Sequence, residues 1–136
     1  MPSRLQALIS YPMSGPSKQW HSKTGMPQWV QYELVQPAAV CKVSFLPRLT
    51  PNNYVKNLKP DCPRSYKIQG SDDGSKFHTL LLVRGQKCSK NVRITQYIDS
   101  LNQRAFRFYR LTVLEVLGRK NGNKFGVIRD LKLFGK

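Results

Sequence analysis

The chain has 136 residues, 40% of them hydrophobic, which suits one domain with a single core and excludes a chain that is disordered over most of its length. Its 23 Lys and Arg outnumber its 7 Asp and Glu, so the net charge is +16 and the surface is expected to attract nucleic acid, anionic lipid or sulfated glycan. No apolar run approaches the roughly 20 residues that a membrane-spanning helix needs.

The N-terminal part predicts loops followed by two strands. Residues 1–10 favour a short strand or a lead-in at the edge of the core, whereas 11–27 hold three Pro, two Gly and four Ser or Thr, the composition of a loop. In 27–34 and 40–46 apolar residues occupy every second position, which is the period of a half-buried strand. The intervening residues 36–39 predict a turn.

The central part predicts a long irregular segment and then a hairpin. Residues 47–64 contain four Pro and three Asn and are strongly basic, and long loops of this kind are commonly functional. The stretch 65–77, SYKIQGSDDGSKF, alternates apolar and polar residues before Asp73-Gly74 supplies a tight turn. The return strand is expected over 77–83.

The C-terminal part predicts three more strands, over 94–98, 105–117 and 127–134, separated by basic turns at 84–93 and 118–126. The chain as a whole gives seven or eight short strands and no 3.6-residue periodicity. This pattern predicts an antiparallel β-sandwich or barrel.

Residues that could carry catalysis or bind a metal are sparse. The two histidines, His21 and His78, lie on different segments, and no CxxC or HxxxH spacing indicates zinc. The acids are scattered singly, so no pair of a general acid and a general base is indicated. The sequence therefore predicts a protein that is not an enzyme, with no metal site and no cofactor.

The three cysteines, Cys41, Cys62 and Cys88, are widely spaced and odd in number, which argues against a full disulfide framework. A bridge between Cys62 and Cys88 stays open. No signal peptide is visible, so an intracellular location is favoured, although an excised extracellular module would look the same.

Five motifs follow one another along the chain: WHS before PQWVQYEL, the strand end FLPR, PRSYKIQGSDDGSKF, FRFYRL and the terminal DLKLFG. In this order they resemble the discoidin domain, also called the coagulation-factor type C domain, of the galactose-binding-like superfamily. The resemblance implies a single all-β domain over residues 1–136. Its fold would be an eight-stranded antiparallel jelly-roll β-sandwich with ligand loops at one end.

The chain departs from the family pattern at two points. Neither terminus carries the Cys that staples many extracellular members, which again favours an intracellular protein. Many carbohydrate-binding relatives hold a structural calcium with an Asp in the first loop and an acidic residue near the last strand. Asp130 matches the second position, but residues 12–18 contain no acid, so calcium is not expected.

The resemblance places residues 11–26, 47–62 and 118–125 at or beside the ligand end. Cations in these segments suit phosphate or sulfate, rings can stack and amides can bond hydroxyls. Arg48 and Tyr54 are the preferred contacts. The predicted ligand-binding residues are Tyr11, Trp20, His21, Lys23, Arg48, Asn52, Asn53, Tyr54, Lys56, Arg119, Lys120 and Asn121. For Trp20, packing in the core is the alternative.

These residues predict a non-catalytic module that recognises an anionic or polar ligand, namely a glycan, a phospholipid headgroup or a peptide, through basic loops at one end. The alternative is a nucleic-acid-associated or intracellular protein–protein scaffold domain that uses its basic surface. A nucleic-acid contact would weaken steeply with salt and depend little on any single loop residue. The sequence does not indicate an oligomeric state.

Overall fold

The structure is a computed structural model. It describes residues 3–4, 19–21, 27–47, 62–88, 92–117 and 127–135. Among these residues there is no helix with the length and apolar character needed to span a bilayer.

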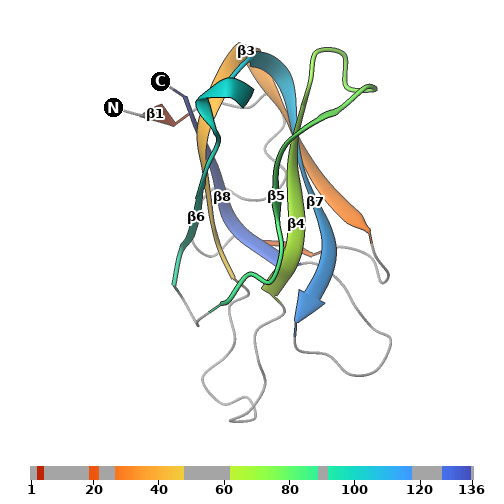
Figure 1. Cartoon of the computed structure of the whole chain (residues 1–136), viewed down its shortest axis with the longest axis vertical. Helices are drawn as coiled ribbons and strands as arrows, with labels where there is room; N and C mark the ends of the chain where they lie inside the picture. Colours follow the sequence, from red (N-terminus) through yellow and green to blue (C-terminus); the bar gives the residue numbers. More distant parts are fainter. Residues whose placement is uncertain are drawn as a thin grey trace.

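The described residues form β-strands and one short 3-10 helix (Figure 1). The elements are β1 (Ser3–Arg4), β2 (Gln19–His21), β3 (Gln28–Leu46), β4 (Cys62–Ser71), β5 (His78–Val83), β6 (Ile94–Tyr97), η1 (Ser100–Asn102), β7 (Ala105–Leu117) and β8 (Val127–Gly135). All pairings between them are antiparallel. The predicted all-β antiparallel sandwich is therefore confirmed, while an eight-stranded jelly roll for the whole chain stays a prediction.

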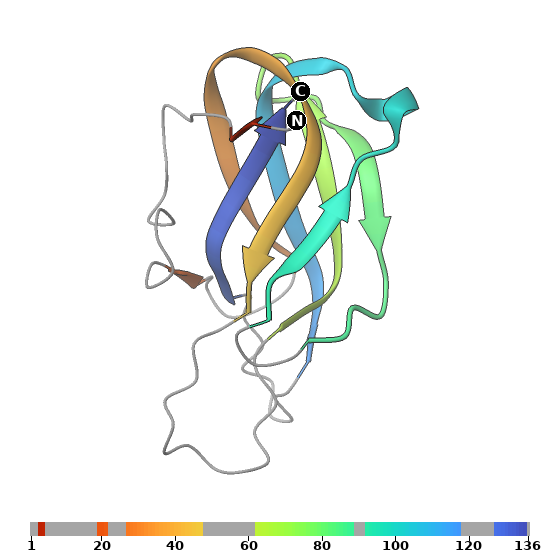
Figure 2. The same ribbon diagram turned by 90° about the vertical axis from the view of Figure 1, so that its left-hand side faces the viewer.

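The strands form two layers that share β3. In the first sheet, the N-terminal half of β3 pairs with β7, which pairs with β4, and β5 lies at the edge. In the second sheet, β8 pairs with β1, β2 and the C-terminal half of β3, and β6 lies at the edge (Figure 2). Side chains between the two layers form the core.

One 19-residue strand, β3, stands where the sequence predicted two strands and a turn. The register of its pairing with β7 shifts between Glu33 and Ala38, where the strand passes from one sheet to the other. Pro37 lies in this shift, and proline is tolerated there because a bulge does not require every backbone N–H. The prediction of a turn at residues 36–39 is therefore wrong, although it coincides with the place where the strand bends.

The phenol of Tyr109 holds this bend in place. Its hydroxyl donates to the carbonyl oxygen of Ala38 at 2.6 Å and accepts from the amide of Val40 at 3.2 Å. Burial raises the pKa of Tyr109, so the hydroxyl remains a donor at any physiological pH. One side chain of β7 thus bonds two backbone groups of β3 directly after the register shift.

The core follows from the alternation seen in the sequence. Phe45, Tyr66, Val113 and Ile128 are 0% exposed, and they come from four different strands. The rings of Phe45 and Tyr66 meet edge to face across the two sheets, with 5.6 Å between their centroids. Such aromatic pairs are stabilising beyond the area they bury.

The central hairpin is confirmed, with β4 and β5 paired antiparallel and Gly74 at φ 79° in the turn between them. Several boundaries differ from prediction: β5 begins one residue later than expected, at His78, and β8 ends one residue later, at Gly135. β4 begins at Cys62, inside the stretch predicted as irregular, because Cys62 and Pro63 pair with the end of β7. The expected strand 94–98 ends at Tyr97.

Candidate ligand-binding end of the sandwich

Several strand ends meet at one end of the sandwich. Leu46, near the end of β3, pairs with Arg129, and Cys62, at the start of β4, pairs with Leu117 at the end of β7. His21, at the end of β2, pairs with Val127 at the start of β8. The lower part of Figure 1 shows these ends together. The segments 22–26, 48–61 and 118–126 are therefore all attached to this end, which we call the loop end.

Two of the twelve predicted ligand-binding residues, Trp20 and His21, have a described backbone. They lie in β2, paired with Ile128 and Val127, so the prediction of a loop at these positions is wrong. Backbone pairing with the free edge of β8 overrides the loop-like composition around them. The other ten lie outside the described residues: Tyr11, Lys23, Arg48, Asn52, Asn53, Tyr54, Lys56, Arg119, Lys120 and Asn121.

Charge is distributed unevenly between the sandwich and the segments at the loop end. Segments 22–26, 48–61 and 118–126 contain seven Lys and Arg and a single acid, Asp61. The other six acids lie in the described part of the chain, and each of them has a structural partner there. They are Glu33, Asp72, Asp73, Asp99, Glu115 and Asp130.

Asp130 is the most buried of these acids and anchors β6 at the loop end. Its side chain is 1% exposed, it forms an ion pair with the guanidinium of Arg93, and the ammonium of Lys132 lies 3.5 Å away. Arg93 also donates to the hydroxyl of Ser44 at 2.6 Å and to the carbonyl oxygen of Asp130 at 3.2 Å. The cluster joins the residue before β6 to β3 and β8.

The same cluster bears on calcium, because the resemblance matched Asp130 to a calcium position. Two cationic side chains already contact its carboxylate, and a divalent cation beside them would meet like charge. No group of three His, Cys, Asp or Glu suited to a metal is found among the described residues. Asp130 therefore fits an internal ion pair and does not fit a calcium ligand.

A polar network fixes the segment 84–88 at the loop end. The hydroxyl of Tyr66 donates to Gln86 Oε1 at 3.0 Å, and Gln96 Nε2 donates to both of them. The amide of Gln86 donates to the carbonyl oxygen of Arg64 at 2.7 Å. Burial raises the pKa of Tyr66 to about 12, so its hydroxyl stays protonated.

The cysteines divide into two states. Cys88, at the end of this segment, is disulfide-bonded, whereas Cys41 is free and buried. The sequence left such a bridge open. The side chain of Cys62 lies outside the described residues.

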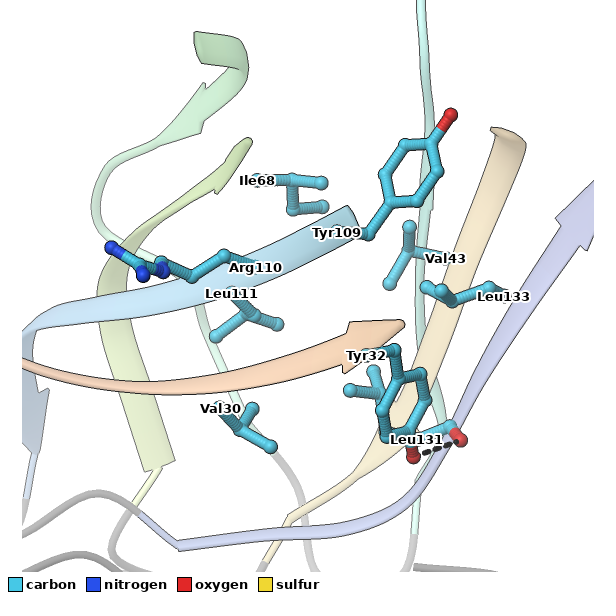
Figure 3. A pocket seen from close by; sticks show the side chains of 9 residues that line it. All are labelled: Val30, Tyr32, Val43, Ile68, Tyr109, Arg110, Leu111, Leu131 and Leu133. Carbon is cyan, nitrogen blue, oxygen red and sulfur yellow. Dashed lines mark hydrogen bonds between the residues drawn. The ribbon is translucent and has the colours of Figure 1, made fainter. Parts of the chain in front are cut away.

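A cavity of about 10 Å³ lies between the sheets (Figure 3). This volume holds about one water molecule. Its lining is Val30, Tyr32, Val43, Ile68, Tyr109, Arg110, Leu111, Leu131 and Leu133. The hydroxyl of Tyr32 donates to the carbonyl oxygen of Leu131 at 3.2 Å beside it. The cavity is a gap in core packing and is too small for a ligand.

The described residues offer no catalytic pair. Every described carboxylate is engaged as given above, and His78 stacks on Phe106 with 5.7 Å between ring centroids. A general acid and base must both reach a substrate.

Comparison with known proteins bears on the fold just described. The family model of the F5/8 type C domain matches residues 6–131. The chain belongs to this family. The resemblance read from the five sequence motifs is thereby confirmed. No curated protein matches the chain.

Three solved structures illustrate how far the likeness of this F5/8 type C domain extends. The module CBM32-3 from a family 31 glycoside hydrolase of Clostridium perfringens has a TM-score of 0.70 at 20% identity, covering 89% of this chain and 77% of that one. The family 32 carbohydrate-binding module of C. perfringens NanJ, in complex with galactose, has a TM-score of 0.69 at 16% identity, covering 98% and 99%. A third C. perfringens module, in complex with GalNAc-β-1,3-galactose, has a TM-score of 0.68 at 18% identity, covering 99% and 93%. At these identities the likeness shows the shared sandwich.

Proposed function

We propose that this F5/8 type C domain is a non-catalytic module that binds an acidic glycan at its loop end. The observation that carries the proposal is the attachment of segments 22–26, 48–61 and 118–126, with seven cations and one acid between them, to the same end of the sandwich. Clustered cations with few competing carboxylates attract sulfate or carboxylate groups.

The composition of these segments suits a sugar as well as a charge. Tyr54 can stack on a sugar ring, and Asn52, Asn53 and Asn121 can bond hydroxyls. Arg48 can hold a sulfate or carboxylate in a bidentate manner, which a lysine cannot. Sugar-binding neighbours of the same fold, one bound to galactose and another to GalNAc-β-1,3-galactose, support a glycan over a peptide or a lipid headgroup.

The rigid surroundings support binding without large rearrangement. The ion pair of Arg93 with Asp130 and the network around Tyr66 fix described residues directly beside the segments in question. Preformed anchors lower the entropy that a binding loop loses when it closes on a ligand.

A glycan array followed by isothermal titration calorimetry tests this. We expect sulfated or uronate-containing oligosaccharides to bind more tightly than neutral galactosides, and Arg48→Gln or Tyr54→Ala to weaken binding at least tenfold while the melting temperature is kept. Lys76→Gln removes the same charge from the exposed β4–β5 turn and should leave affinity unchanged. Equal loss from Lys76→Gln, or binding to anionic liposomes without any glycan binding, would overturn the proposal.

A further inference from the structure

The outer face of the second sheet carries a pattern that the loop end does not explain. Phe134 of β8 pairs with Lys42 of β3, which pairs with Tyr97 of β6. In the next row, Lys132 pairs with Ser44. Directly paired residues point to the same side of a sheet. Each row therefore runs across three strands that lie side by side (Figure 2).

These side chains face away from the core. Val43 and Leu133, their neighbours along β3 and β8, are buried between the sheets. Tyr97 is 69% exposed, and the side chain of Lys132 is 31% exposed. None of the strands and helices that the structure describes packs over this face. We call it the β6 face, made of Lys42, Thr95, Tyr97, Lys132 and Phe134 around the buried Ser44, which is 3% exposed.

The β6 face combines aromatic rings with cations. The ammonium of Lys42 lies 4.2 Å from the ring centre of Phe134, in the same row as Tyr97. The one acid beneath the face, Asp130, is buried and bound to Arg93 and Lys132. Arg93 also donates a hydrogen bond to the hydroxyl of Ser44. The exposed chemistry is therefore the ring of Tyr97, the hydroxyl of Thr95 and the ammonium of Lys42, whereas the ammonium of Lys132 is shared with Asp130.

The groups on the β6 face suit some polyanionic ligands better than others. A sugar chain is held mainly by amides and carboxylates that bond its hydroxyls, and the β6 face has no free group of either kind. Planar bases stack on exposed rings, and phosphates pair with ammonium groups, which is how flat sheet surfaces hold single strands. We infer that the β6 face is a binding surface for single-stranded nucleic acid.

The spacing agrees with this inference. Neighbouring strands lie about 4.8 Å apart, so Phe134 and Tyr97, which are two strands apart, are separated by about 10 Å. Lys42 lies between them in the row and its ammonium extends over the ring of Phe134, so a base stacked on Tyr97 would bring its phosphate beside Lys42. A duplex keeps its bases stacked on one another and offers the rings no base face, so single strands should be preferred.

The test uses fluorescence anisotropy of a fluorescein-labelled oligothymidylate and of a duplex of the same length, at several salt concentrations. Tyr97→Ser should raise the Kd for the single strand by about 5- to 150-fold, which corresponds to the loss of one stacked base. Tyr97→Phe keeps the ring and should keep the affinity. Lys42→Gln should lower the slope of log Kd against log salt by about 0.7.

Controls separate this face from diffuse charge and from the loop end. Lys76→Gln and Arg119→Gln each remove one charge elsewhere, and neither should cancel the preference for a single strand over a duplex. The inference is overturned if Tyr97→Ser binds like the unchanged protein, if the duplex binds as tightly as the single strand, or if only heparin binds. Melting temperatures of the variants exclude unfolding, and Tyr97 is exposed enough for the fold to tolerate the change.

Discussion

The guanidinium carbon of Arg110 lies 3.9 Å from the ring centre of Trp29. The ring of Phe77 lies at the same distance from it. Arg110 Nε and Nη2 also donate to Gln31 Oε1 at 3.1 and 2.9 Å. One side chain of β7 therefore joins β3 to Phe77, the residue directly before β5. Burial lowers the pKa of this guanidinium, which nevertheless stays charged at neutral pH.

Arg110→Lys should therefore destabilise the protein although the charge is kept. An ammonium cannot lie flat against two rings and bond Gln31 at the same time, so we expect a loss of about 1–2 kcal/mol in the free energy of unfolding. Urea denaturation measures it. Arg84→Lys is the matched control, since Arg84 is exposed, and it should change stability by less than about 0.5 kcal/mol. Equal effects of the two changes would contradict a stacking role.

The sequence predicted the features that depend on local pattern. Alternation along residues 27–34 and 40–46 identified strands, because one side of each strand must enter the core. The turn at Asp73-Gly74 was recognised because its residues have few alternatives. The family was identified from the order of motifs, each of which lies within one or two strands.

Features that depend on distant partners could not be read in this way. Arg93 and Asp130 are separated by 37 residues and Arg93 and Ser44 by 49, so no local pattern marks them as one cluster. The continuous β3 was missed because Pro37 is a turn signal unless a bulge accommodates it. β2 was missed because its pairing depends on the edge of β8, more than 100 residues later.

Gly70→Ala should destabilise β4 through one ring. A Cβ at this position would lie 2.8 Å from Cγ of Phe106, closer than real contacts allow. The ring cannot move freely, because it stacks on His78 and meets Tyr109 edge to face. We expect a loss of about 1–3 kcal/mol by thermal or urea unfolding.

A double-mutant cycle identifies the cause of that loss. Phe106→Leu should recover part of the cost in the Gly70→Ala background, giving a coupling energy of about 1 kcal/mol. Gly85→Ala is the control, because Gly85 has φ 66° and nothing within 4 Å, so its cost is backbone strain. Phe106→Leu should therefore not reduce the cost of Gly85→Ala. Additivity at Gly70 would mean that the ring is not responsible.

Arg93→Met should cost about 3 kcal/mol, because the buried carboxylate of Asp130 loses its ion pair with the guanidinium of Arg93. Arg104→Met breaks a comparable pair with Asp72 whose side chains are 57% and 61% exposed, and it should cost about 0–1 kcal/mol. Asp130→Asn should be milder than Asp130→Ala, since Asp130 has φ 49° and Asn tolerates that conformation. If the ion pair of Arg93 with Asp130 contributed nothing to stability, the free energies of unfolding of the four variants, measured by urea denaturation, would not follow this order.

The carboxylate of Asp73 should make the hairpin sensitive to acid. Its Oδ1 accepts from the amides of Ser75 and Lys76 at 2.8 and 3.0 Å, and from the hydroxyl of Ser71 at 3.0 Å. These hydrogen bonds lower the pKa of Asp73 from 3.8 to about 2. Because the pKa is depressed in the folded state, the stabilisation is complete above about pH 4 and is lost as the pH falls towards 2. The melting temperature of Asp73→Asn should therefore lie below that of the unchanged protein at pH 6, and the gap should close between about pH 4 and pH 2.

Asp72→Asn removes the same charge from the neighbouring position, where a single exposed ion pair with Arg104 is lost, and should open a smaller gap at pH 6. A gap for Asp73→Asn that stays constant across this range would show that the turn does not depend on the ionised carboxylate.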